Sequence, residues 1–146
     1  MPNNGTQTQM AALPVVSNGK GDIRILMITS RDTGRWVLPK GWPMKGKNLR
    51  QAAEQEALEE AGVIGDLSKK PIGVYHYLKR IENGEDIPCE VVLYPMKVTK
   101  LLRKWQERGE RKRKWFSVKG AAKRVLEPDL SDLLLKIKDD PKALGF

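Results

Sequence analysis

Apolar residues gather in short stretches along the chain, separated by clusters of glycine, proline and polar residues. Apolar runs of this length, with turn-forming residues at each end, are typical of β-strands. The run at 23–29, for example, follows a glycine-rich turn at 19–22 and precedes a polar turn at 31–35. The strands predicted in this way are residues 12–16, 23–29, 36–38, 72–78, 90–98 and 114–116. A hairpin loop at 82–86 is expected to join two of them.

Three other stretches have helical spacing and recognisable helix ends. After a loop at 39–47, expected to be irregular because it contains two prolines and two glycines, Asn48 is suited to cap a helix and Gly62 to end it. Ser117 is expected to cap a helix to about residue 125, and Pro128 begins a last helix over 129–138. Strands that alternate unevenly with three helices predict an α/β fold with a mixed sheet between helical layers.

The composition fits one globular domain. A chain of 146 residues with 40% hydrophobic content is long enough to bury a core. We expect a single domain over residues 11–146 and a mobile arm over residues 1–10. The single cysteine, Cys89, excludes an intrachain disulfide and suits a reducing compartment. Since neither a signal sequence nor a membrane-length apolar run is visible, we expect a cytoplasmic protein without membrane contact.

The net charge of +9 is concentrated in one segment, residues 100–114. Only Glu107 and Glu110 oppose its positive charge. Its basic residues are Lys100, Arg103, Lys104, Arg108, Arg111, Lys112, Arg113 and Lys114. Such a segment binds a nucleic acid backbone or a phosphorylated small molecule, or is simply solvated surface.

Three glutamates at 56–60 indicate metal chemistry. Glu56, Glu59 and Glu60 have the spacing i, i+3 and i+4, which places their carboxylates on one helix face. Carboxylates this close repel one another unless a cation lies between them. Magnesium binds carboxylate oxygens and keeps positions for phosphate oxygens, so the cluster suits a polyphosphate substrate. A solvated acidic face is the alternative, but Leu58 and Ala61 indicate that the opposite side is packed too.

The segment 41–63 resembles the Nudix box. The family pattern is Gly, five residues, Glu, seven residues, then Arg-Glu-U-x-Glu-Glu-x-Gly-U, where U is aliphatic. The matching residues are Gly41, Glu56, Glu59, Glu60, Gly62 and Val63. Lys47 and Gln55 replace the box glutamate and arginine. Because that pair carries opposite charges, losing both leaves no unpaired charge, and Lys47 instead adds a cation near the expected phosphate path.

Two flanking segments narrow the resemblance. The run RWVLPKG at 35–41 is similar to diphosphoinositol polyphosphate phosphohydrolases, and its LPKG part also to diadenosine polyphosphate hydrolases. The run RKRKWF at 111–116 looks like RKREWF of the diphosphoinositol branch. The resemblance implies an α/β/α sandwich and a hydrolase that uses Mg²⁺ or Mn²⁺. Its substrate would be a small-molecule polyphosphate, namely a dinucleoside or diphosphoinositol polyphosphate.

On this resemblance, Glu56 and Glu60 are expected to hold the metal with the backbone carbonyl near Lys40 or Gly41. Glu59 is expected to be a third ligand or the general base, and Glu107 or Glu110 is an alternative base outside the box. The candidate phosphate-binding residues are Arg35, Lys40, Arg111 and Arg113. For each of these four, a solvated surface charge is the alternative.

Other functions remain open at this level. An RNA 5′-end pyrophosphohydrolase would use the basic segment as a docking surface, but no aromatic-basic RNA-binding motif is visible. A binding module without turnover is compatible with Lys47 and Gln55, although all three later glutamates are retained. Trp42 and Trp105 lie in loops, where they either stack on a base or pack beneath the loop. By strand alternation His76 shares a sheet face with Val74, which favours a core or sheet-face role over catalysis.

Overall fold

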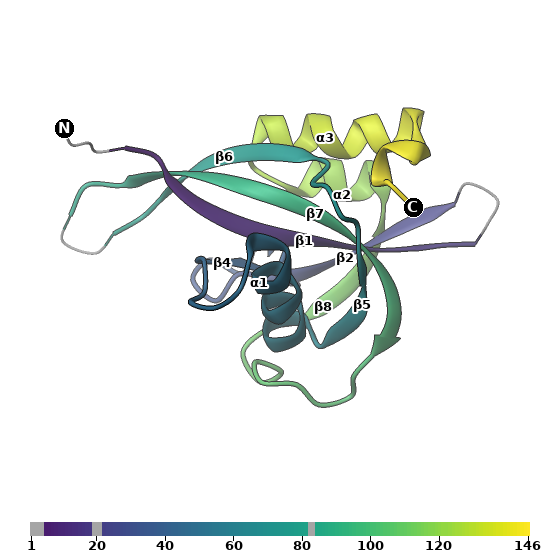
Figure 1. Cartoon of the computed structure of the whole chain (residues 1–146), viewed down its shortest axis with the longest axis horizontal. Helices are drawn as coiled ribbons and strands as arrows, with labels where there is room; N and C mark the ends of the chain where they lie inside the picture. The colour runs from purple at the N-terminus through teal and green to yellow at the C-terminus, as the bar shows by residue number, and fades with distance from the viewer. Residues whose placement is uncertain (1–4, 19–21, 82–83) are drawn as a thin grey trace.

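A computed structural model of the chain describes residues 5–18, 22–81 and 84–146, and an eight-stranded mixed sheet forms its centre (Figure 1). Strands β1 and β7 lie side by side and are parallel, whereas the other paired strands are antiparallel. The strands are β1 (Gln7–Ser17), β2 (Ile23–Thr29), β3 (Trp36–Val37), β4 (Lys40–Gly41), β5 (Val63–Leu67), β6 (Gly73–Lys79), β7 (Ile87–Leu101) and β8 (Arg113–Ser117).

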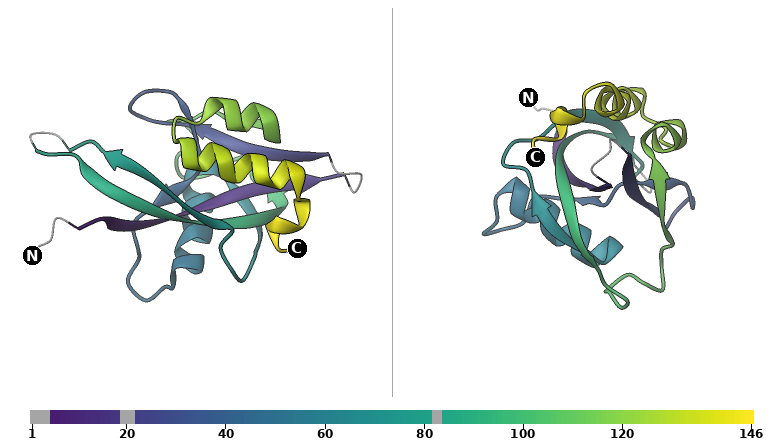
Figure 2. Two further views of the ribbon diagram at one scale, coloured as in Figure 1. Left: turned by 90° about the horizontal axis from the view of Figure 1, so that it is seen from above. Right: turned by 90° about the vertical axis from the view of Figure 1, so that its right-hand side faces the viewer.

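Helices cover both faces of this sheet (Figures 1 and 2). One face packs against α2 (Val118–Arg124), α3 (Pro128–Asp139) and the short 3₁₀ turn η2 (Pro141–Leu144). The other face packs against α1 (Leu49–Glu56) and the π-helical turn η1 (Ala57–Ala61). The α/β/α sandwich with a mixed sheet that the sequence predicts is therefore confirmed.

Alternation along β1 shows how one strand serves both layers. Ala11 and Leu13 lie in the core under α2 and α3, whereas Met10 and Ala12 lie in the core under α1. All four side chains are completely buried. A strand covered on both faces reads as a continuous apolar run rather than as an alternating one, which is the pattern of this segment.

The acidic helix has the ends that the sequence predicts. The Asn48 side chain accepts a hydrogen bond from Gln51 N (2.8 Å), and the Gln51 side chain accepts one from Asn48 N (2.9 Å), which completes a capping box. Gly62 ends the segment with a φ of 66°. Its last turn is a π-helix, however, and such turns are rare and often occur at functional sites.

The N-terminal arm expected over residues 1–10 is wrong for residues 7–10. These residues belong to β1 and pair with β7, and Gln9 and Met10 are buried. The partner strand lies about 80 residues away in sequence, and no local pattern reveals such a pairing. The first four residues lie outside the described part of the chain.

Three further differences concern strands and turns. The loop 39–47 contains the short strand β4, which pairs with Met10 and Ala11 of β1, so it is not wholly irregular. Strand β5 was not predicted, since glycine and aspartate interrupt its short apolar pattern. The turn predicted at 19–22 and the hairpin loop predicted at 82–86 fall partly outside the described residues.

Candidate active site

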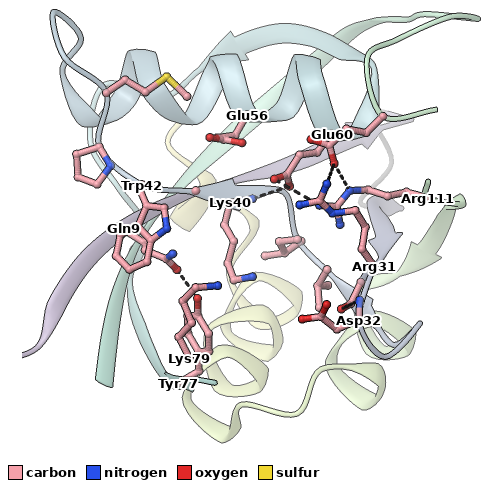
Figure 3. Close-up of a pocket in the computed structure, with 17 residues that line it drawn as sticks. Gln9, Arg31, Asp32, Lys40, Trp42, Glu56, Glu60, Tyr77, Lys79 and Arg111 are labelled. Atoms are coloured by element: carbon pink, nitrogen blue, oxygen red, sulfur yellow. Dashed lines mark hydrogen bonds and ion pairs between the residues drawn. The ribbon is translucent and has the colours of Figure 1, made fainter. Parts of the chain in front are cut away.

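A pocket of about 510 Å³ opens beside α1, between strand β6 and the loop that joins β7 to β8 (Figure 3). Its lining comes from six separate stretches of the chain, at 9, 30–32, 37–44, 56–60, 77–79 and 107–111, so the tertiary fold assembles it. Its charged lining is balanced, with four acidic and four basic side chains. These are Asp32, Glu56, Glu60, Glu107, Arg31, Lys40, Lys79 and Arg111.

Glu56 and Glu60 form the acidic wall of the pocket. Lys40 N donates a hydrogen bond to Glu60 Oε1 (3.2 Å). Gly41 lies directly against Glu56, and a Cβ at this position would collide with the Glu56 carboxylate. Glycine thus lets the backbone of β4 approach the helix.

Glu56 and Glu60 destabilise each other's charged form. Burial, followed by the nearby charge of Glu60, raises the pKa of Glu56 to about 8. Burial also raises the pKa of Glu60, against the opposing charge of Arg111. A positive charge between the oxygens of such a pair would favour the charged form of both carboxylates.

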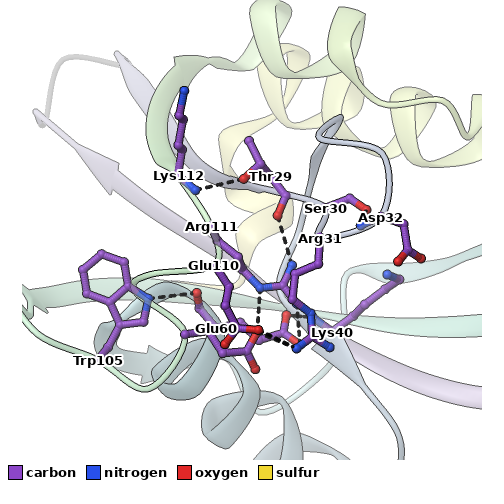
Figure 4. A network of polar contacts seen from close by, with 11 residues as sticks. Thr29, Ser30, Arg31, Asp32, Lys40, Glu60, Trp105, Glu110, Arg111 and Lys112 are labelled. Atoms are coloured by element: carbon purple, nitrogen blue, oxygen red, sulfur yellow. Dashed lines mark hydrogen bonds and ion pairs between the residues drawn. The ribbon is translucent and has the colours of Figure 1, made fainter.

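Arg111 links Glu60 to the loop between β7 and β8 (Figure 4). Its Nη2 lies 3.6 Å from Glu60 Oε2, and its Nε donates a hydrogen bond to Glu107 Oε1 (2.7 Å). Arg31 extends the network, with its Nη1 3.9 Å from Glu107 Oε1 and 3.0 Å from Glu110 Oε1. The predicted phosphate-binding residue Arg111 therefore lies in the pocket, where it already pairs with two carboxylates.

The Lys40 side chain and Trp42 also line the pocket, and Trp42 lies on the side away from Arg111 (Figure 3). Burial lowers the pKa of Lys40, and its Nζ lies 5.0 Å from the centre of the Tyr77 ring. The Tyr77 hydroxyl donates a hydrogen bond to Gln9 Oε1. Trp42 is 40% exposed, so part of its indole surface faces solvent at the pocket rim.

Glu59 differs from its two neighbours on the helix. Its carboxylate accepts a hydrogen bond from Gln55 Nε2, and it does not line the pocket. The π turn contributes to this arrangement, because it changes the spacing at which side chains return to one helix face. Three carboxylates on one face, as α-helical spacing predicts, are thus reduced to two in the pocket.

Two predicted phosphate-binding residues also lie outside the pocket lining. Arg35 Nη2 donates a hydrogen bond to Glu127 Oε2 (3.0 Å), which ties the turn before β3 to the start of α3. Arg113 donates to the carbonyl groups of Ala61 (2.9 Å) and Leu102. The Arg113 Nη groups are thus occupied by protein carbonyls, whereas the buried Nη1 of Arg35 has no hydrogen-bond partner among the described residues. Phosphate binding by Arg35 and Arg113 stays a prediction, and in this structure both side chains connect parts of the fold.

The structure adds pocket residues that sequence reasoning missed. Gln9 was assigned to a mobile arm, and Tyr77 and Lys79 lie on a strand without a recognisable motif. Arg31 and Asp32 belong to a turn whose polar residues are typical of any loop. The resemblance of the LPKG run is the one sequence signal close to these residues, and it points only to Lys40 and Gly41.

The residues present fit a hard divalent cation. Among the described residues, no cluster of three or more His, Cys, Asp or Glu side chains is arranged to hold a metal. Mg²⁺, however, is usually bound by one or two carboxylates together with water and substrate phosphates. Glu56 and Glu60 supply that number, and the close approach of Gly41 brings a backbone segment to the same place.

Fold and site together define a Nudix protein, and the chain belongs to this family. The NUDIX domain model matches residues 7–136. Within the described residues, no helix is long and apolar enough to cross a membrane.

Several named relatives are similar to the chain. Nudix hydrolase 12, mitochondrial, of Arabidopsis thaliana is 36% identical over 102 residues, which are 68% of this chain and 50% of the relative. Human diphosphoinositol polyphosphate phosphohydrolase 3-alpha is 34% identical over 119 residues, which are 78% of this chain and 68% of the relative. Against Arabidopsis Nudix hydrolases 12 and 16 the chain spans only 50% and 64% of the relatives' length.

Solved structures support the fold. An Ap4A hydrolase from C. elegans matches with a TM-score of 0.63 and 18% identity, covering 92% of this chain and 98% of that one. The NUDIX domain of Shewanella oneidensis NrtR, complexed with ADP ribose, matches with a TM-score of 0.66 and 14% identity, covering 90% and 88%.

Proposed function

We propose that the chain hydrolyses a phosphoanhydride bond in a nucleoside polyphosphate, using Mg²⁺ or Mn²⁺ held by Glu56 and Glu60. The observation that carries this proposal is the convergence of these two carboxylates with Lys40 in one pocket. The raised pKa of Glu56 supports it, because a half-buried carboxylate pair is stabilised by a bound cation. Membership of the Nudix family supports the reaction class.

In this proposal each charged residue of the pocket has a separate role in metal binding, phosphate binding or proton transfer. Glu56 and Glu60 hold the cation, helped by the backbone at Gly41, and Lys40 binds a phosphate oxygen. The cation, when bound, neutralises phosphate charge and acidifies the attacking water. Glu107, oriented by Arg111, is the candidate general base, in place of Glu59, which lies outside the pocket lining.

Two features favour a nucleoside substrate over an inositol pyrophosphate. The four acidic and four basic side chains of the pocket balance, whereas a densely phosphorylated ring needs an excess of cations. Trp42 at the rim offers a surface on which an aromatic base can stack. An inositol pyrophosphate is the second candidate, favoured by the human relative of that name.

The first test is a substrate panel assayed with Mg²⁺ and with Mn²⁺, with products identified by mass. The panel contains dinucleoside polyphosphates, diphosphoinositol polyphosphates and 5′-triphosphorylated RNA. We expect the dinucleoside polyphosphates to be cleaved fastest. Trp42→Ala should then weaken kcat/KM for them by about 1–3 kcal/mol, the value of one stacked base, and leave inositol substrates unaffected. Faster cleavage of an inositol pyrophosphate would select the second candidate.

The metal assignment has its own test in Glu60→Gln, which removes an anionic ligand while keeping the shape of the side chain. We expect kcat/KM to fall by roughly 100-fold or more, the scale of one lost electrostatic contact in a transition state. Glu59→Gln is the matched control, because it makes the same change outside the pocket lining. Near wild-type turnover by Glu60→Gln at saturating Mg²⁺ would show that this helix does not hold the metal.

A further inference from the structure

The loop between β7 and β8 covers the C-terminal end of the acidic helix. The last carbonyl groups of a helix have no partners within it. Here four successive carbonyls each accept a hydrogen bond from distant parts of the chain. The pairs are Glu59 O with Glu107 N (3.0 Å), Glu60 O with Trp105 Nε1 (3.1 Å), Ala61 O with Arg113 Nη1 (2.9 Å) and Gly62 O with Leu102 N (2.8 Å).

Trp105 contributes its indole N–H to this cap and donates it to the Glu60 carbonyl (Figure 4). The Arg113 guanidinium lies 3.9 Å from the centre of its ring, a stacked cation–π contact. On the helix side, the ring fills the space beside Gly62, where an added Cβ would come within 2.6 Å of a ring carbon. The indole N–H is thereby aimed at one acceptor, the Glu60 carbonyl.

The same loop also holds the Glu60 side chain. Arg111 lies 3.6 Å from the Glu60 carboxylate and is itself bound to Glu107 of the loop. Arg111 is anchored further by its hydrogen bond to Thr29 O (3.0 Å) at the end of β2. The loop between β7 and β8 therefore holds both the backbone carbonyl of Glu60, through Trp105, and its carboxylate, through Arg111.

We propose that Trp105, stacked on Arg113, is a positioning residue that sets the direction in which the Glu60 carboxylate enters the pocket. This rests on the proposed function, in which Glu60 holds the divalent cation. Glu56 belongs to the α-helical part of the segment and Glu60 to the π turn. Their relative orientation therefore depends on keeping a rare turn geometry, and the indole hydrogen bond contributes to that within the turn itself.

Trp105→Phe tests this inference, because it keeps a ring for stacking and removes the donor to Glu60. Trp115→Phe is the matched control, since Trp115 lies on β8 and packs into the core under α1. We expect Trp105→Phe to bind Mn²⁺ about 10-fold more weakly without substrate, as is usual when a residue behind a metal ligand is lost. The affinity is measured by electron paramagnetic resonance. kcat at fixed Mg²⁺ should fall and KM for the nucleotide should stay within about 2-fold, while the control keeps wild-type Mn²⁺ affinity.

Wild-type Mn²⁺ affinity and kcat in Trp105→Phe would overturn the inference. If the wild-type protein binds no divalent cation, the proposed function fails, and amide hydrogen exchange then decides the role of Trp105. Faster exchange of the Leu102 and Glu107 amides in Trp105→Phe would support a cap that holds the helix end. Unchanged exchange at both amides would overturn it.

Discussion

Lys47 and Gln55, the two departures from the Nudix box, have separate consequences. Gln55 donates to the Glu59 carboxylate, so a neutral partner holds this glutamate outside the pocket lining. Lys47 is exposed and does not line the pocket, so the cation expected from it near the phosphates is Lys40 instead. The replacement of these two box residues leaves Glu56 and Glu60 in the pocket lining.

Glu56→Gln should stabilise the metal-free protein. The pKa of Glu56 in the folded state, about 8, lies above the ordinary value of 4.5. Between these values the folded state holds a proton that the unfolded state has lost, so stability falls as the pH rises from 4.5 to 8. Glutamine removes this loss. Melting temperatures in chelator should therefore rise on substitution at pH 8 and change less at pH 4.5.

In excess Mg²⁺ the wild-type protein should instead melt at a higher temperature than Glu56→Gln, because the Glu56 carboxylate is stabilised by the bound cation and the glutamine is not. A melting temperature that Glu56→Gln lowers at pH 8 in chelator would mean that the carboxylate is stabilised without metal. That result would remove the electrostatic support for a cation site.

At the scale of single elements, the residues at the helix ends determine where each helix begins and stops. The capping box of Asn48 and Gln51 fixes where α1 begins, and the left-handed Gly62 fixes where η1 ends. Gly46, in the loop before α1, has a similar φ of 81° but nothing near the place of a Cβ. A substitution at Gly46 therefore tests backbone strain alone, whereas one at Gly62 tests backbone strain together with a steric clash.

Gly46→Ala should cost about 1–2 kcal/mol of unfolding free energy, the cost of a left-handed conformation in a residue with a Cβ. Gly62→Ala should cost clearly more, because its Cβ also collides with the Trp105 ring. Urea unfolding of the two variants measures the difference. Equal losses would mean that Trp105 moves aside freely and that the cap is loosely packed.

A histidine joins β6 to α3 and β7. His76 Nδ1 lies 2.8 Å from Asp129 Oδ2, and Nε2 lies 3.2 Å from Glu90 Oε2. The sheet-face position predicted for His76 is correct, but its neighbours Val74 and Leu78 are exposed, so the face is turned to solvent. Hydrogen bonds to Asp129 and Glu90 raise the pKa of His76 above its usual 6.5.

Because the folded-state pKa is raised, the stabilisation by His76 is complete below pH 6.5 and is lost as the pH rises through the folded-state value. His76→Ala should therefore lower the melting temperature more at pH 6 than at pH 9. The effect is small, below about 1 kcal/mol, since the pair is half exposed. Leu78→Ala on the same strand is the control, and its effect should not depend on pH. An equal loss for His76→Ala at both pH values would contradict the charged pairing.

At the scale of the whole molecule, the net charge is +9. The basic residues behind it are of two kinds, those whose side chains bind other parts of the protein and those that face solvent. Within the segment 100–114, Arg111 and Arg113 are drawn inward by carboxylates and helix carbonyls. Arg103, Lys104 and Arg108 are exposed. Lys100, Lys112 and Lys114 are exposed as well. Docking of a polyanion on this segment therefore stays a prediction, with Arg111 and Arg113 already engaged inside the fold.

Replacing Arg103, Lys104 and Arg108 together by glutamine should leave kcat/KM for a dinucleoside polyphosphate within about 2-fold, because these residues do not line the pocket. Binding of short RNA should weaken, and its slope against log salt should fall by about 2 if all three contact phosphates. Filter binding at several salt concentrations measures this. A large loss of nucleotide turnover, or faster cleavage of 5′-triphosphorylated RNA than of any nucleotide, would favour the RNA 5′ end as substrate.

The sequence by itself determined the features that depend on near neighbours in the chain. The ends of α1 and η1 follow from Asn48 and Gly62, and the carboxylate pair follows from the four-residue spacing of Glu56 and Glu60. The apolar runs likewise predicted most strands and the layered α/β fold. Caps, turns and side-chain periodicity act over a few residues, which is why a pattern reveals them.

Only the tertiary structure decided what each charged side chain contacts. It placed residues 7–10 in the sheet, moved Glu59 out of the pocket lining and directed Arg35 and Arg113 to protein acceptors. The partners of residues 7–10 and of the two arginines lie on segments remote in sequence, and the π turn that changes the helix spacing is covered by a distant loop. The free energy of a buried charge depends on the groups around it, and the fold alone brings those groups together.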